Sequence, residues 1–172
     1  MSTFDRTIII AGAAGQGLVT VGELLSKILT RAGYEVFATQ YYMSRIRGGH
    51  NSFRIRISDM PQFASADECD ILFAFDQDAV AQHFEMLHES GTVILSDKLN
   101  AMNKQCVSIP FDTLASKPLY ENVVALGVLC ALLGLDRSLP EQLLSERFAP
   151  KGEKIIADNI ETLGGAYDWS LN

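Results

Sequence analysis

The chain begins with a β-branched and apolar run that leads directly into a glycine-rich turn. Thr7 to Ala11 predict a strand, the turn follows as Gly12-Ala13-Ala14-Gly15-Gln16-Gly17, and residues 18–32 place apolar side chains at a helical period. A second alternating run at 34–39 completes a strand–helix–strand unit. Because such a crossover joins strands that run in the same direction, this beginning predicts a parallel sheet with helices beside it.

Strand and helix patterns continue to alternate along the rest of the 172 residues. They predict strands at 70–75, 92–95 and 106–109, and helices at 78–89, 122–135, 140–148 and 152–163. The run 51–58 has one polar face, so we expect an edge strand or a member of an antiparallel pair. The pattern predicts one α/β domain over residues 1–172: a three-layer α/β/α sandwich whose Rossmann-like sheet is mostly parallel, with one antiparallel edge strand.

Charge is unevenly distributed along the chain. The 14 basic and 21 acidic residues give a net charge of -7, which disfavours binding to nucleic acid. Four arginines and no acid nevertheless lie between Arg45 and Arg56, whereas residues 57–97 hold nine acids and no Lys or Arg. Arg54 and Arg56 alternate with apolar residues, and we expect them on a strand face that meets solvent or a subunit.

The glycine turn has the composition of an anion-binding loop. Between a strand and a helix, backbone N–H groups and the helix dipole together favour a bound anion. Its G-x-x-G-x-G spacing differs from the G-x-G-x-x-G of dinucleotide-binding proteins, no acid stands at Thr39-Gln40, and no Gly-Lys-Ser/Thr follows as in a P-loop. A turn whose glycines only permit close packing would have the same sequence, so both interpretations stay open.

A second candidate segment, Arg45-Ile46-Arg47-Gly48-Gly49-His50-Asn51, combines guanidinium groups with a Gly-Gly pair. Arginine forks suit bidentate contacts with phosphate or carboxylate. If the first unit is parallel, this segment and the glycine turn lie at the same carboxyl edge of the sheet. Alternatively, the arginines pair with acids of this chain or of a partner. His50 is a possible hydrogen-bond donor to an anion, or a strand-start histidine facing solvent or a partner; no catalytic residue is predicted.

The cysteines and histidines argue against a metal centre on this chain. Cys69, Cys106 and Cys130 lie far apart in the sequence, which does not match the spacing of iron–sulfur or structural zinc ligands. We expect Cys69 and Cys130 in the core. The histidines share no metal-ligand spacing, and His83 and His88 are predicted to be surface residues on different faces of a helix. No secretory signal or run of roughly 20 apolar residues is present, so we expect a cytoplasmic chain with no membrane partner.

These motifs, in this order, resemble the gamma subunit or gamma domain of 2-oxoacid:ferredoxin oxidoreductases. The resemblance covers nearly the whole chain, through the glycine turn and its helix, Ser44–Asn51, Ser58-Asp59, Asp70–Phe75, and Lys151-Gly152-Glu153 with Asn159. The Ser-Arg-Ile-Arg-Gly-Gly-His-Asn form most resembles gamma domains fused ahead of an alpha domain in 2-oxoglutarate-type enzymes. We therefore expect a free-standing subunit or an excised domain.

The resemblance implies the oxidative decarboxylation of a 2-oxoacid, such as pyruvate or 2-oxoglutarate, with coenzyme A as acyl acceptor and ferredoxin as electron acceptor. It implies alpha and beta subunits as partners, with or without a delta or ferredoxin-type subunit, and it places thiamine diphosphate and the iron–sulfur clusters on those partners. This chain is implied to be inactive alone, to assist coenzyme A binding and to complete the complex.

The residues implied to bind coenzyme A lie in the two candidate segments: Gly12, Gly15, Gln16, Gly17, Arg45, Arg47, Gly48, Gly49, His50 and Asn51. Two alternatives remain. The chain could be a stand-alone NAD(P)-binding Rossmann-like protein, or a purely structural docking subunit. An isolated chain would leave apolar partner-facing surface exposed, which makes a homodimer plausible.

Overall fold

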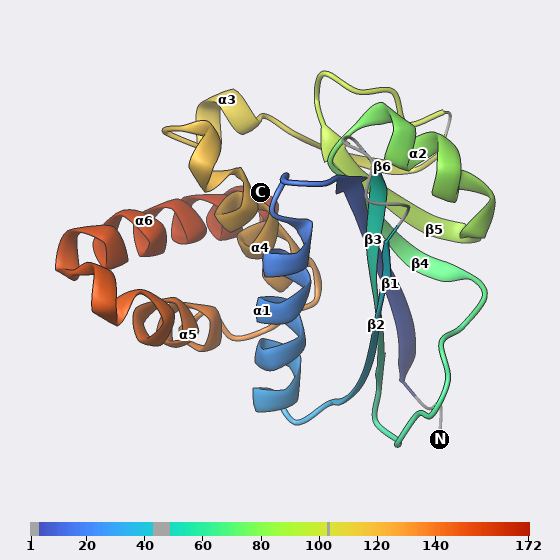
Figure 1. The fold of residues 1–172 in the computed structure, drawn as a ribbon, viewed down its shortest axis with the longest axis horizontal. Helices are drawn as coiled ribbons and strands as arrows, with labels where there is room; N and C mark the ends of the chain where they lie inside the picture. Colours follow the sequence, from blue (N-terminus) through green and yellow to red (C-terminus); the bar gives the residue numbers. More distant parts are fainter. Residues whose placement is uncertain (1–3, 43–48, 103) are drawn as a thin grey trace. The chain divides into compact units, whose positions relative to one another are not determined.

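The computed structural model describes residues 4–42, 49–102 and 104–172, and the chain divides into two compact units (Figure 1). The first comprises Met1–Gly22 and Tyr34–Pro110 and contains the sheet, while the second comprises Glu23–Gly33 and Phe111–Asn172 and is helical. Helix α1 (Leu18–Arg31) contributes its first turn to the first unit and its remaining turns to the second.

The first unit is built on a six-stranded mixed sheet with the order β2-β3-β1-β4-β5-β6. Its strands are β1 (Asp5–Ala13), β2 (Glu35–Tyr42), β3 (His50–Ser58), β4 (Cys69–Ala74), β5 (Leu87–Ser96) and β6 (Cys106–Ile109). Strand β3 runs antiparallel to both of its neighbours, β1 and β2, and the pairs β1–β4, β4–β5 and β5–β6 are parallel. The predicted α/β fold with a mostly parallel sheet is confirmed. The antiparallel strand lies second from the edge, and β2 takes the edge position.

Helical segments of the first unit pack on both faces of this sheet. On one face, Ala79 and Val80 of α2 (Gln77–His83) join a buried cluster with Ile9 and Leu72. On the other face, Gly22 at the end of the first turn of α1 lies against the Phe53 ring, so closely that a Cβ on this glycine would overlap the ring. Burial on both faces explains why the central strands are apolar throughout.

Strand β5 begins earlier than the sequence pattern predicts. The predicted helix 78–89 is too long: α2 ends at His83, the short 3-10 turn η1 (Phe84–Met86) follows, and β5 starts at Leu87. Leu87 is 5% exposed and pairs with Cys69 of β4. Gly91 lies within this strand, where a Cβ would come within 3.0 Å of the Asp70 carbonyl oxygen.

The second unit consists of helices and short 3-10 turns. Its elements besides α1 are α3 (Phe111–Leu114), η2 (Pro118–Tyr120), α4 (Glu121–Leu132), α5 (Ser138–Phe148), η3 (Ala149–Lys151) and α6 (Glu153–Ser170). Nearly every residue of α4 is buried, as its uniformly apolar sequence predicts. Helix α6 is longer than predicted, because the tail after Leu163 continues the helix and includes Trp169.

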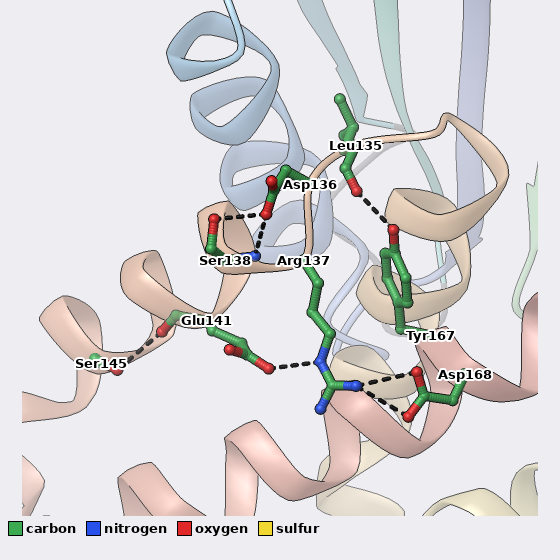
Figure 2. Close-up of polar contacts among 8 residues, drawn as sticks. All are labelled: Leu135, Asp136, Arg137, Ser138, Glu141, Ser145, Tyr167 and Asp168. Carbon is green, nitrogen blue, oxygen red and sulfur yellow. Dashed lines mark hydrogen bonds and ion pairs between the residues drawn. The ribbon is translucent and has the colours of Figure 1, made fainter.

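Arg137 connects the beginning of α5 to the end of α6 (Figure 2). Its Nε atom donates to Glu141 at 2.6 Å, and its Nη1 atom donates to both carboxylate oxygens of Asp168 at 3.0 and 2.9 Å. Beside this pair, the Tyr167 hydroxyl donates to the Leu135 carbonyl oxygen at 2.8 Å. These contacts orient the two helices within the unit.

Within the described part of the chain, no helix combines the length and the apolar character needed to cross a membrane.

Candidate functional site

The glycine turn connects β1 to α1 and is held by its own side chains. The Ala13 amide donates to Gln16 Oε1 at 2.6 Å and to Asp76 Oδ2 at 2.8 Å. Gly15 and Gly17 have φ angles of 96° and 82°, a backbone region that favours glycine. At Gly12, a Cβ would overlap Gln16 Oε1 and lie 2.8 Å from the Phe75 Cβ, so there is no room for a side chain at this position.

The start of β3 lies beside this turn. In the antiparallel register, His50 is opposite Ala13 and Asn51 is opposite Gly12. The Gly49 carbonyl oxygen accepts a hydrogen bond from the Ala14 amide at 3.2 Å. The described part of the second predicted segment, residues 49–51, therefore meets the glycine turn at one edge of the sheet, as the positions of both segments after strands suggest.

Of the ten residues predicted to bind coenzyme A, seven lie together at this edge: Gly12, Gly15, Gln16, Gly17, Gly49, His50 and Asn51. Arg45, Arg47 and Gly48 lie outside the described residues. The contacts establish where the seven residues are, and their role in binding stays a prediction.

Asp76 belongs to this site although no sequence motif includes it. It precedes α2, where its Oδ1 atom caps the helix by accepting from the Ala79 amide at 2.8 Å. Its other oxygen accepts from Ala13 at the end of β1. An Asp directly after an apolar strand and before a helical pattern is a typical N-cap, but only the fold shows that it also holds the glycine turn.

A pair of histidines lies next to the glycine turn. His50 Nε2 and His83 Nε2 are 2.8 Å apart, and their ring centroids are separated by 5.0 Å. His83 is only 9% exposed, so the predicted surface position is wrong: it ends α2 with its side chain against β3. His88 is exposed, on β5 rather than on a helix. Burial, with further contributions from His50 and Arg54, lowers the pKa of His83 from 6.5 to about 4.

Arg54 and Arg56 contact their own unit. Arg54 is 8% exposed, donates from Nη1 to the Ala66 carbonyl oxygen at 2.5 Å, and places its guanidinium 5.8 Å from the centre of the Tyr41 ring. Arg56 forms a bidentate pair with Asp5 at 3.0 and 2.6 Å, which lowers the pKa of that carboxyl. The predicted solvent- or subunit-facing position is wrong for Arg54, because the segment after β3 and the turn after α2 cover it.

The next question is whether the described side chains form a set of metal ligands. Within residues 4–42, 49–102 and 104–172, no group of three or more His, Cys, Asp or Glu side chains is arranged to hold a metal ion. Cys69 and Cys130 are buried, as predicted, and burial raises the pKa of each thiol to about 12. Cys106 is exposed on β6.

A cavity of about 420 Å³ lies in the second unit, away from any predicted residue. It is lined by Thr113, Leu114, Ser116, Lys117, Tyr120, Asp158, Glu161, Thr162 and Gly165. The Tyr120 hydroxyl donates to Asp158 at 3.4 Å within this lining. One lysine and two carboxylates line the cavity, so the charges of its lining do not favour an anion.

Comparisons with known proteins agree over most of the chain. The family model described as pyruvate ferredoxin/flavodoxin oxidoreductase matches residues 7–169. The 2-oxoglutarate synthase subunit KorC of Archaeoglobus fulgidus is 27% identical over 161 residues, which are 91% of this chain and 86% of that protein. The 2-oxoacid:ferredoxin oxidoreductase subunit alpha of a Sulfolobus species is 37% identical over 76 residues, 44% of this chain and 12% of the relative. This chain thus spans a small part of that longer relative.

Among solved structures, the fold is similar to 2-oxoglutarate:ferredoxin oxidoreductase from Magnetococcus marinus, determined with 2-oxoglutarate, coenzyme A and succinyl-CoA bound. The TM-score is 0.86 at 24% identity, over 97% of this chain and 31% of that one. Because the sequence identity is as low as 24%, this similarity is evidence for the fold alone.

Proposed function

Because the chain belongs to the pyruvate ferredoxin/flavodoxin oxidoreductase family, we propose that it acts as the gamma subunit, or gamma domain, of a 2-oxoacid:ferredoxin oxidoreductase. The match to a protein named 2-oxoglutarate synthase subunit KorC over 86% of its length supports this role. The family match runs through both compact units, which supports one gamma-type domain over residues 1–172.

The complex would oxidatively decarboxylate a 2-oxoacid. The carboxylate leaves as CO2, the remaining acyl group forms a thioester with coenzyme A, and the electron pair passes to ferredoxin. Thiamine diphosphate and the iron–sulfur clusters would belong to partner subunits. This chain does not fit a cluster with four cysteine ligands, because it has three cysteines and two of them are buried. Without those groups, the isolated chain would have no turnover.

We assign the edge formed by the glycine turn and the start of β3 to coenzyme A. The observation that carries this assignment is the hydrogen bond from the Ala14 amide to the Gly49 carbonyl oxygen, which joins the two predicted segments. Coenzyme A carries a pyrophosphate and a ribose phosphate, and arginine forks and helix N-termini bind such groups. A structure of a similar fold was determined with coenzyme A bound, which supports the same ligand here.

Asp76 limits which groups would contact a phosphate. The Ala13 amide is occupied by Gln16 and Asp76, so it is not a donor for the ligand. The first N–H groups of α1, which follow the turn and have no acceptor within the helix, would serve instead. Arg47 lies two residues before Gly49 in the sequence and would supply the balancing positive charge.

The test uses the complex assembled with its alpha and beta partners. We expect Arg47→Ala to weaken coenzyme A binding about tenfold, the value of one charge-assisted hydrogen bond, and to leave assembly intact. Arg147→Ala, on an exposed residue in the last turn of α5, removes the same charge and should change neither property. Unchanged coenzyme A affinity together with a broken complex would instead identify this loop as a docking surface.

A further inference from the structure

Alternate residues of β3 place a row of polar side chains on one face of the sheet. The row ends beside the glycine turn, where β3 begins. His50, Ser52 and Arg54 share that face, because successive strand residues point to opposite sides. Ser52 and Arg54 are buried, whereas His50 at the end of the row is partly exposed. The row therefore links the interior of the first unit to the edge that we assign to coenzyme A.

The Met86 sulfur lies beside both the buried histidine and Arg54. The Sδ atom lies 3.3 Å from His83 Nδ1 and 3.6 Å from Arg54 Nη2. A thioether sulfur carries no proton and can only accept, so a hydrogen bond at the His83 contact requires the proton to be on Nδ1, as Arg54 donates to the same sulfur. His83 is neutral near pH 7, because burial and the neighbouring Arg54 and His50 oppose its charged form. A neutral imidazole that carries its proton on Nδ1 has a lone pair on Nε2.

The tautomer of His83 then determines that of His50. The two Nε2 atoms are 2.8 Å apart, a hydrogen-bond distance, and only one of them can be the acceptor. Since His83 accepts, His50 must donate from Nε2. The remaining nitrogen of His50, Nδ1, accepts a proton without breaking this bond, and it then becomes a second donor.

We propose that His83 is a positioning residue, which holds His50 with its proton on Nε2 so that Nδ1 is the atom offered to a phosphate of coenzyme A beside the glycine turn. The phosphate part of this inference rests on the proposed function, whereas the tautomer does not. In this arrangement a His50 ring that carries both protons donates from Nδ1–H to a phosphate oxygen and from Nε2–H to His83. No bond to the ligand is formed.

The first test needs no variant. The chain has three histidines, so the imidazole nitrogens of a 15N-histidine-labelled sample can be assigned by long-range 1H–15N correlation spectra at neutral pH. We expect a protonated Nδ1 in His83 and a protonated Nε2 in His50. A protonated Nε2 in His83 would overturn the inference whatever ligand the edge binds.

The second test links the tautomer to the ligand in the assembled complex. We expect His83→Leu to remove the acceptor, to leave His50 as a mixture of tautomers, and to weaken coenzyme A binding about tenfold. His83→Gln provides an acceptor oxygen and should restore most of the affinity, while His88→Gln, on an exposed residue bonded to Ser90, should change nothing. Melting temperatures confirm that each variant is folded.

The outcomes separate the two proposals. If the wild-type tautomers are as expected but neither Arg47→Ala nor His83→Leu affects coenzyme A, the coenzyme A assignment fails and the tautomer assignment stands. If Arg47→Ala weakens binding and folded His83→Leu does not, His83 has no positioning role.

Discussion

The Oδ2 atom of Asp76 accepts a hydrogen bond from the amide of Ala13 at 2.8 Å, although the two residues are 63 positions apart. The other carboxylate oxygen caps α2 at the Ala79 amide. One side chain thus connects the end of β1, the glycine turn and the start of α2. The turn is held from outside as well as by its own Gln16.

Asp76→Ala should lower the free energy of unfolding by about 2 kcal/mol, from the lost helix cap and the lost hydrogen bond to the Ala13 amide, which then keeps only Gln16 as an acceptor. Asp76→Asn should cost less, because its amide oxygen can still cap the helix. The matched control is Asp78→Ala, on an exposed residue in the first turn of the same helix, which we expect to change stability by about 0.5 kcal/mol or less. Urea unfolding followed by circular dichroism measures all three, and equal losses for Asp76→Ala and Asp78→Ala would contradict this role.

Gly127 and Gly165 should respond in opposite ways to the same substitution. In α4, a Cβ on Gly127 would lie 2.6 Å from the Leu163 carbonyl oxygen and 3.0 Å from the Ala166 Cβ of α6. Backbone on both sides has little room to move, so Gly127→Ala should destabilise by about 1–3 kcal/mol, or a melting temperature lower by several degrees.

Gly165 in α6 has no atom within 4 Å of its potential Cβ. Gly165→Ala should therefore stabilise by about 0.5–1 kcal/mol through helix propensity. Melting temperatures of both variants test this pair of expectations, and a stabilising Gly127→Ala would show that α4 and α6 are packed less closely than described.

The stability of the protein should fall between pH 7 and pH 5 because of His83. Its pKa is about 4 in the folded state against 6.5 ordinarily, so the unfolded chain binds more protons as the pH falls through this range. The contribution of neutral, buried His83 to the stability of the protein is fully present above about pH 6.5, and it is lost progressively as the pH falls toward 4. From pH 7 to pH 5, this group alone should account for a loss of about 2 kcal/mol.

His83→Gln removes this titration and should flatten the profile, whereas His88→Gln should keep it. His50 and Arg54 are the other charged or titratable groups beside His83, and both remain in the two variants. The measurement is the urea concentration at the unfolding midpoint, determined at several pH values. Its slope against pH is then compared between each variant and the wild type. The same slope in His83→Gln and in wild type would exclude His83 as its source.

Much of the fold follows from local pattern. Three parts of the fold lie where the spacing of apolar residues predicts them: the strand–turn–helix start, the short strand β6 and the buried helix α4. This spacing is informative because it reflects which faces of a strand or helix are buried. The predicted helix 78–89 extends too far, since Leu87 becomes a strand residue by pairing with Cys69, and no local signal records that partner.

The sequence alone determined the α/β class, the family and the two segments that form the candidate site, because these depend on periods and motifs among residues near one another in the chain. Only the tertiary structure brought His83 and Asp76 to that site and buried Arg54, because pairing of β3 with β1 and packing of α2 on the sheet decide which distant side chains meet. Burial and hydrogen bonding then set the protonation of His83, which no pattern of residues along the chain encodes by itself.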